Sequence, residues 1–224
     1  MNFLEIFAIL ARGAGYTIGV TVAGISAALA IGLAAAFLSR LPWKPVKAML
    51  AAYTYVFRSI PLLVLLFIVF FGLPGAGVRV PPFASMVLCL GLVSGAYLAE
   101  IFRGAMAAVN PDEIMAADAM GMSRLRIFRH IILPQMFRMS VPGMVNEFTS
   151  ILKYTPFAYT VGIPEIMKEA MSLAALTLRG LEIYLAVGIL YFAIYRLFVM
   201  LFMAIEGRFM IPGISWPRIE SERP

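Results

Sequence analysis

The amino-acid sequence predicts an all-α integral membrane protein with about five transmembrane helices. Hydrophobic residues make up 62% of the 224-residue chain and charged residues only 13%, whereas about a quarter of an average soluble domain is charged. Residues 13–39, 59–78 and 80–99 contain no charged side chain. Each run is long enough to cross a hydrocarbon core of about 30 Å, which takes about 20 helical residues. We therefore expect a single transmembrane domain over residues 1–224.

In order along the chain, the expected spans are about 14–38, 54–76, 83–105, 137–158 and 183–205. The first span is rich in glycine and alanine, which lets helices approach closely in lipid. Prolines are expected to break or end helices at Pro61, Pro74, Pro142 and Pro156. Residues 157–180 are not expected to span. There, Ile163-Pro164-Glu165 opens a short amphipathic stretch that would lie at the outer surface.

The charges predict the orientation of these spans in the inner (cytoplasmic) membrane. With the N-terminus outside and the C-terminus in the cytoplasm, twelve of the 18 Lys and Arg residues lie in inner segments and five in outer segments. This satisfies the positive-inside rule. The net charge of +6 is then a feature of topology, and nucleic acid is not an expected partner. Glu5 and Arg12 interrupt the first residues, so a cleavable signal peptide is not expected.

The segment between the third and fourth spans, at about residues 108–135, carries the signals of two short helices joined by a glycine. Asn110 is expected to cap the first helix, and Glu113 to reach back to the cap amide. Gly121 stands where this helix would end in a left-handed residue. Ser123 is expected to cap the second helix, which Pro134 would close.

The same segment presents apolar side chains to the cytoplasm. Methionine adapts its shape to a partner surface, and an amphipathic helix fits into another protein's groove. We therefore expect a docking surface, with an ordinary amphipathic interfacial helix as the alternative. Its expected members are Met115, Ala116, Ala117, Met120, Leu125 and Phe128.

Ala116-Ala117, Gly121 and Ile132-Leu133-Pro134 together resemble the EAA loop of permease subunits of bacterial ABC importers. The resemblance implies the MetI-like permease fold and a coupling helix that docks on an ATP-hydrolysing subunit. Met115 stands where that loop has its namesake glutamate. A salt bridge at this position is therefore not implied, whereas the apolar docking surface is.

Ionisable residues at membrane depth are costly and indicate function or structural pairing. Glu100 and Arg103 are three residues apart and are expected to pair on one helix face. Glu147 and Lys153 are six apart and are expected to meet partners on other helices. Arg196 lies midway in the last span, where a carboxylate elsewhere or a subunit interface would pair with it. The expected solute path is lined by Arg58, Tyr97, Glu100, Asn146, Glu147 and Lys153, with bracing of neighbouring helices as the alternative.

Further stretches resemble the polar amino-acid permeases within that family. The patterns RGTPLL…YFGLP, AYxAEIxRG, NEFxSLLK and GxPEL are similar to residues 58–74, 96–104, 146–153 and 162–165 in turn. Ser59, Ile60 and Tyr154 depart from these patterns, which have Gly, Thr and Asp there. The matches cover most of residues 14–205, and they imply import of a polar amino acid or a related small solute.

The sequence lacks the parts of an enzyme. No Gly is followed by Lys, so a Walker loop is absent. His130 is the single histidine and Cys89 the single cysteine, so neither a Ser/His/Asp set nor a thiolate metal site is expected. We expect no catalytic residue, no metal and no cofactor on this chain. ATP and Mg would be bound by the partner ATPase.

About five helices do not enclose a solute pathway well, so at least two permease subunits are expected, as a homodimer or a heterodimer. The resemblance implies the remaining partners, which are an ABC ATPase dimer, a periplasmic solute-binding protein and a small polar solute. Import of a methionine-like or opine-like solute is one alternative. An ion-driven secondary transporter is another, but it would show inverted repeats, and none is visible. A structural membrane subunit would not need the docking loop.

Overall fold

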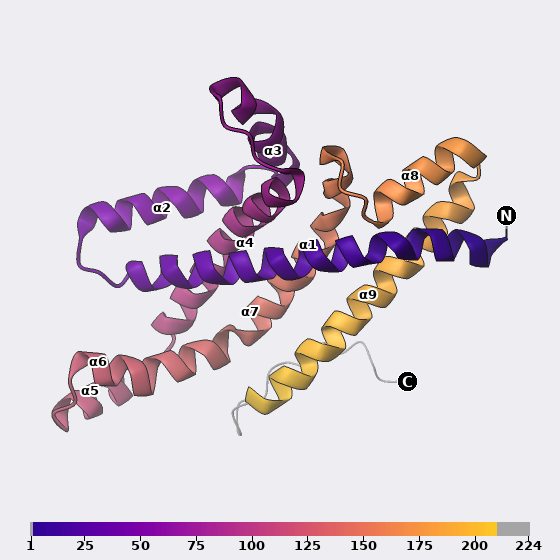
Figure 1. Ribbon diagram of the computed structural model, residues 1–224. Helices are drawn as coiled ribbons and strands as arrows, with labels where there is room; N and C mark the ends of the chain where they lie inside the picture. Colours follow the sequence, from indigo (N-terminus) through magenta and orange to yellow (C-terminus); the bar gives the residue numbers. More distant parts are fainter. Residues whose placement is uncertain (1, 210–224) are drawn as a thin grey trace.

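The computed structural model describes residues 2–209, and every regular element in this range is helical (Figure 1). The long helices are α1 (Phe3–Leu38), α4 (Pro82–Ala107), α7 (Leu133–Tyr154) and α9 (Gly180–Phe209). The shorter helices are α2 (Lys44–Ser59), α3 (Leu62–Phe67), α5 (Pro111–Ala119), α6 (Arg124–Ile127) and α8 (Ile166–Thr177). Two π-helical turns (Ile68–Gly72 and Phe128–Ile132) and two 3-10 turns (Leu73–Ala76 and Thr155–Val161) complete the elements. The all-α prediction is confirmed.

Three helices are long and apolar enough to cross a membrane, and they confirm the first, third and fifth predicted spans. They are α1, α4 and the part Gly180–Phe202 of α9. Helix α7 occupies the predicted fourth span. It is not among the helices that qualify by length and composition, since it carries Arg138, Glu147 and Lys153 beside several other polar residues.

The predicted second span, 54–76, is not one continuous helix, and the predicted break at Pro61 is confirmed. Helix α2 ends at Ser59, and the pair formed by α2 and residues 62–76 is bent by 103°. Ile60 is extended, with φ −85° and ψ 128°, because a residue before proline avoids the helical region. Pro61 also lacks the N–H that would continue the ladder. Helix α2 buries no residue fully, and it is tied to α4 by Tyr53 Oη, which donates to the Leu92 carbonyl at 2.8 Å.

Helices α1 and α4 form the centre of the bundle, and glycines bring them together. A Cβ added to Gly32 would lie 2.7 Å from Leu98 Cβ, and one added to Gly91 would lie 2.9 Å from Ala27 Cβ. Such contacts leave no room for a side chain, so the two backbones pack as closely as small residues allow. The predicted packing role of the glycine-rich first span is confirmed for these positions.

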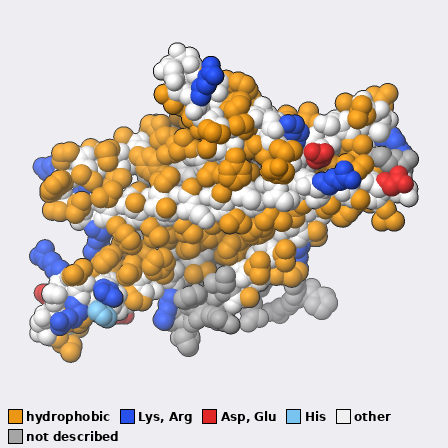
Figure 2. Space-filling view, viewed as in Figure 1, with side chains coloured by type: hydrophobic (Ala, Val, Ile, Leu, Met, Phe, Trp, Pro, Cys, Tyr) orange, Lys and Arg blue, Asp and Glu red, His pale blue; other side chains and the backbone are white. Residues whose placement is uncertain are grey.

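Both ends of the molecule differ in composition from its middle. The α1–α2 connection and helices α5 and α6 lie at one end, and the N-terminus and α8 lie at the other (Figure 1). Hydrophobic side chains cover the middle of the visible face, whereas Lys, Arg, Asp and Glu side chains gather mostly toward the ends (Figure 2). This distribution fits a bundle whose middle lies in hydrocarbon.

The short outer helix is confirmed as α8, and a buried carboxylate begins it. Glu165 is fully buried and accepts hydrogen bonds from the Met167 N–H (2.9 Å), the Lys168 N–H (2.8 Å) and Tyr191 Oη (2.7 Å). Burial raises the pKa of the Glu165 carboxyl, and these hydrogen bonds offset part of that rise. A Cβ added to Gly13 would lie 2.6 Å from the Glu165 carbonyl carbon. Helix α8 is therefore seated directly on the backbone of α1.

Candidate functional site

The loop between α4 and α7 begins as the sequence predicts. Asn110 Oδ1 accepts from the Asp112 N–H at 2.9 Å, and Pro111 takes the first helical position. Glu113 does not complete the predicted capping box. Its Oε2 accepts instead from Gln135 Nε2 at 2.6 Å, which ties the first turn of α5 to the start of α7. A partner distant in sequence thus replaces the local one.

Gly121 has the predicted left-handed conformation, with φ +77°. The Gly121 N–H donates to the Asp118 carbonyl at 2.9 Å, and the Met122 N–H donates to the Ala117 carbonyl at 3.1 Å. This pair of bonds is the Schellman motif, which ends a helix and satisfies its last carbonyls. The turn therefore fixes the angle at which α6 follows α5.

The second short helix, α6, differs from the prediction at both of its ends. Ser123 stands in the N-cap position of α6, but its side chain makes no capping bond. Pro134 does not close the helix, because α6 runs through the π-helical turn Phe128–Ile132 directly into α7. Pro134 falls near the start of α7, after a widened turn, where its missing N–H is tolerated. Helices α6 and α7 thus form one continuous unit.

The loop exposes part of the apolar surface that the sequence predicts, but two predicted members are not on it, since Ala117 is buried and Phe128 is half-buried. Met115, Met120 and Leu125 are 61%, 83% and 75% exposed. Ala117 and Ile127 are buried and attach the loop to the bundle. The outward apolar residues have no covering within the part of the chain that the structure describes. We name Met115, Met120 and Leu125 the coupling face.

One contact connects this loop to the end of α1. The rings of Phe37 and Phe128 meet edge to face, with centroids 5.8 Å apart. The Arg40 guanidinium lies 5.9 Å from the centroid of the Phe128 ring, within cation–π range. A shift of the π-helical turn would therefore displace the side chains of Phe37 and Arg40 at the end of α1.

The predicted path residues Arg58 and Tyr97 are in contact. The Arg58 guanidinium lies 5.0 Å from the Tyr97 ring centroid, and Tyr97 Oη donates to the Arg58 carbonyl at 3.3 Å. The contact places the cation beside the 103° break between α2 and α3. Arg58 remains exposed there, so its charge is available to a solute.

Glu147 is buried in α7, with 7% of its surface exposed, and it faces α4. Ser94 of α4 is near this carboxylate. Ser94 Oγ is fully buried and has no hydrogen bond of normal geometry with any described residue. Tyr154 interacts electrostatically with both Glu147 and Tyr97. A buried carboxylate and an unsatisfied hydroxyl on facing helices are groups that a polar solute or water would satisfy.

Lys153 and Asn146 do not join Glu147. Both are exposed, and Lys153 Nζ lies 5.5 Å from the ring centroid of Tyr195 on α9. The prediction that both residues meet partners on other helices is thus confirmed for Lys153, whereas Glu147 lies beside Ser94 of α4. The six predicted path residues form separate groups and do not form a single cluster in this chain.

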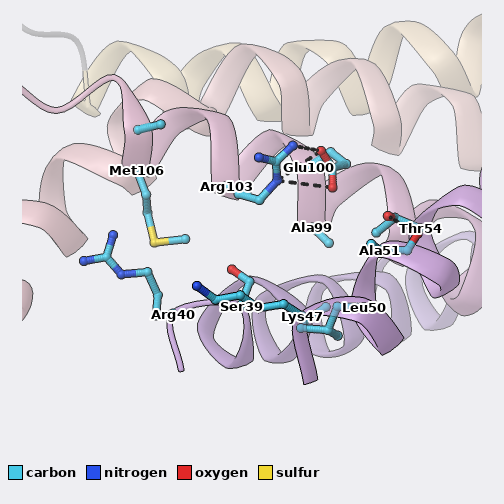
Figure 3. Close-up of a pocket in the computed structure, with 12 residues that line it drawn as sticks. Ser39, Arg40, Lys47, Leu50, Ala51, Thr54, Ala99, Glu100, Arg103 and Met106 are labelled. Atoms are coloured by element: carbon cyan, nitrogen blue, oxygen red, sulfur yellow. Dashed lines mark hydrogen bonds and ion pairs between the residues drawn. The ribbon is translucent and has the colours of Figure 1, made fainter. Parts of the chain in front are cut away.

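The predicted pair of Glu100 and Arg103 is formed, and Arg103 Nε donates to Glu100 Oε2 at 3.1 Å. Both residues line a cavity of about 650 Å³ between α1, α2 and α4, which we name the α1–α2–α4 cavity (Figure 3). Its other polar lining residues are Ser39, Arg40, Lys47 and Thr54, and its small apolar ones are Ala35, Ala51 and Ala99. Glu100 therefore belongs to this cavity and is not placed beside Glu147.

Sequence reasoning missed Ser94 and Arg40 as candidate functional residues. Ser94 lies within an uncharged run that reads as lipid-facing or packing helix, and its polar side chain at membrane depth was the available signal. Arg40 lines the α1–α2–α4 cavity only because α2 and α4 pack beside it. No local pattern encodes that proximity.

Residues 22–211 match the family described as "Binding-protein-dependent transport system inner membrane component". This range covers most of the chain, so the chain belongs to that family and is a membrane component of a transport system. The family predicted from the EAA-like loop is confirmed. Expectations of the MetI-like fold are confirmed by the structural relatives below.

Several sequence relatives span nearly the whole chain. It is 30% identical to the glutamine transport system permease protein GlnP of Escherichia coli (strain K12) over 91% of this chain and 94% of that protein. It is 32% identical to the L-cystine transport system permease protein TcyB of Bacillus subtilis (strain 168), over 89% and 86%. It is 37% identical to the octopine transport system permease protein OccM of Rhizobium radiobacter, over 77% and 75%.

Solved structures share the fold. An amino acid ABC transporter solved with histidines superposes with a TM-score of 0.85 at 29% identity, covering 93% of this chain and 99% of that chain. An inward-facing structure of the MetNI methionine ABC transporter superposes with a TM-score of 0.75 at 19% identity, over 92% and 99%. At that lower identity, the second likeness concerns the fold alone.

Proposed function

We propose that this chain is the permease subunit of an ATP-driven importer for a polar amino acid or a related small solute. The observation that carries the proposal is the coupling face, an exposed apolar surface on a rigid helix–glycine–helix loop of a membrane transport component. Relatives named for glutamine, cystine and octopine transport support a small polar solute. Octopine transport in one relative keeps an opine-like solute as a second candidate.

In the proposed mechanism, the coupling face docks on an ATPase subunit that binds ATP and Mg. ATP binding closes two ATPase subunits and moves the docked loops. Because α6 continues into α7 without an interruption, movement of the loop carries α7 with it. The bundle then alternates between outward-open and inward-open states, as a population shift driven by ATP.

A second permease subunit would complete the solute pathway, as a homodimer or a heterodimer. Arg196 supports this part of the proposal. It is exposed on α9 within the candidate span and has no ion pair among the described residues. A cation at membrane depth is costly without a partner. A carboxylate or carbonyl of a neighbouring subunit would supply that partner.

The solute path is proposed to run past Glu147 and Ser94, with Arg58 and Tyr97 as a second contact. A zwitterionic amino acid needs an anion for its ammonium group and a cation or N–H donor for its carboxylate. The buried Glu147 would meet the ammonium group, and Arg58 would meet the carboxylate. Asn146 and Lys153 are proposed as contributors at the edge of this path, toward α9.

The orientation belongs to the same proposal. The N-terminus and α8 would face the periplasm, where a solute-binding protein delivers its cargo, and the coupling face would lie in the cytoplasm. An ion-driven secondary transporter would have no need of an exposed apolar loop on its cytoplasmic side.

The test compares two exposed leucines at opposite ends. Leu125→Asp places a charge in the coupling face, whereas Leu176→Asp makes the same change on α8, where the leucine is 84% exposed. In complexes co-expressed with the candidate ATPase, Leu125→Asp should abolish co-purification of the ATPase and uptake of labelled glutamine or cystine. Leu176→Asp should keep the ATPase bound. Retention of the ATPase by Leu125→Asp, with uptake at the parent level, would contradict the proposal.

A further inference from the structure

We propose that the α1–α2–α4 cavity binds the phosphate headgroup of an anionic phospholipid. The three helices that line it contribute one basic residue each: Arg40 follows the end of α1, Lys47 lies in the first turn of α2, and Arg103 lies near the end of α4. Glu100 is the only acidic residue in the lining. The cavity thus has an excess of positive charge before any ligand enters.

Two of these cations are left without an anionic partner. Arg103 is engaged by Glu100. Lys47 makes no ion pair or hydrogen bond through its side chain among the described residues. The Arg40 guanidinium lies over the face of Phe128 and forms no ion pair with a described carboxylate. Figure 3 shows Arg40 and Lys47 on the side of the cavity opposite the Glu100–Arg103 pair. A phosphate oxygen has the charge and the acceptors that such side chains bind.

The remaining lining indicates that the ligand has an apolar part. Ala35, Ala51 and Ala99, one from each helix, provide the space, and Leu50 and Met106 add apolar wall. A cavity of about 650 Å³ is in the range of sites for small organic molecules, roughly 300–1,000 Å³. A free phosphate would leave most of it empty, whereas a glycerol phosphate headgroup with the beginning of its acyl chains would fill it.

The place of the cavity in the bundle favours lipid over a soluble ligand. It opens where α1 ends, α2 begins and α4 ends, at the end that also carries α5 and α6 (Figure 1). Ends of spanning helices lie at the headgroup level, where Lys and Arg extend toward the interface. Basic pockets between transmembrane helices at this level bind anionic headgroups. The inference does not depend on which solute the protein moves.

The test measures binding of phosphatidylglycerol to the full chain, purified in the assembly in which it is expressed and held in phosphatidylcholine nanodiscs. Native mass spectrometry would count retained lipid as phosphatidylglycerol is titrated. The double variant Arg40→Gln/Lys47→Gln should weaken binding by roughly 30-fold, since each basic residue near an anionic surface contributes about 1 kcal/mol and 1.4 kcal/mol is tenfold. Ala51→Leu, which fills the cavity without changing charge, should also weaken binding.

The matched control is Lys44→Gln/Arg124→Gln, which removes two exposed cations at the same end of the bundle but outside the cavity lining. This control should bind phosphatidylglycerol like the parent. Equal loss in both double variants would overturn the proposal in favour of diffuse attraction. Parent-level binding by Ala51→Leu would show that the cavity is not the site. Full competition by soluble glycerol 3-phosphate at equal concentration would overturn the lipid as the source of the phosphate.

Discussion

At the scale of single residues, Gly121 sets the angle between α5 and α6, the two helices that carry the coupling face. Its φ of +77° is a conformation that costs a non-glycine residue roughly 1–2 kcal/mol. Nothing lies within 4 Å of the position of an added Cβ. A substitution there therefore acts through the backbone and not through a clash.

Gly121→Val is expected to leave the permease inserted but uncoupled. A β-branched side chain resists the left-handed region, so the turn would open and α6 would leave α5 at another angle. Solute-stimulated ATP hydrolysis should fall by roughly tenfold, as expected for a cost near 1.4 kcal/mol. Gly15→Val makes the same change where space is open and φ is helical, and it should behave like the parent. Normal coupling in Gly121→Val would remove this turn from the mechanism.

Glu165 gives the outer end of the molecule a dependence on pH. Because burial raises its pKa, the folded state holds the proton at pH values where the unfolded chain has released it. Stability should therefore fall as pH rises through the raised pKa, above the ordinary carboxyl range.

The melting temperature of the parent is expected to decrease as pH rises above the ordinary carboxyl range, and that slope should be smaller in Glu165→Gln, which carries no titrating group at this position. Asp118→Asn, which removes an exposed carboxyl of α5 at the opposite end of the molecule, is the control and should keep the parental slope. An unchanged slope in Glu165→Gln would assign the pH dependence elsewhere.

At the scale of elements, interactions between residues close in sequence could be predicted, whereas interactions between distant residues could not. Asn110 and Gly121 act on atoms within a few residues of themselves, so their capping and turn roles could be predicted from the sequence. Glu113 is bound by Gln135, 22 residues away, and no local rule identifies that partner. The continuation past Pro134 depends on a π-helical turn, which the pattern of residues does not reveal.

The same reasoning explains the outcome for the spans and the solute path. The apolar composition of the segments identified α1, α4 and α9, because hydropathy is a property of the segment alone. The 103° break follows from Pro61, but its angle depends on how α3 packs. Glu147 lies beside Ser94 because α7 packs on α4. This packing depends on the three-dimensional structure and could not be predicted from the sequence.

Helix α7 carries the element-scale prediction. Glu147→Gln is expected to lose uptake while assembly, thermal stability and basal ATP hydrolysis remain, because the amide keeps the shape but not the charge that an ammonium group requires. Lys153→Met tests the edge of the path in the same way and should reduce uptake less, since Lys153 faces Tyr195.

Ser150→Ala serves as the control within α7, since the Ser150 hydroxyl bonds only the carbonyl of Asn146 on its own helix. It should transport normally. Disassembly of the complex in Glu147→Gln would indicate that this carboxylate braces helices and would remove it from the path.

At the scale of the whole molecule, the arrangement of charges predicts one orientation. After replacement of Cys89, a cysteine introduced by Ser123→Cys should resist an impermeant thiol reagent in intact cells. One introduced by Ala76→Cys should react, and both positions are exposed. Permeabilised cells, in which both sites should react, provide the control for accessibility. The reverse labelling pattern would invert the topology and exclude docking of a cytoplasmic ATPase on the coupling face.

Helix α1 connects the two ends of this protein without interruption. Its 36 residues form a rod of about 54 Å at 1.5 Å per residue. Gly13 bears on the start of α8 at one end, and Phe37 bears on Phe128 at the other. If binding at one end favours one position of α1, the contacts at the other end that fit this position are favoured as well. Suppose that a solute-binding protein at the outer end raises the affinity of the coupling face for the proposed ATPase. By thermodynamic reciprocity, the bound ATPase then raises the affinity of the outer end for the solute-binding protein by the same factor.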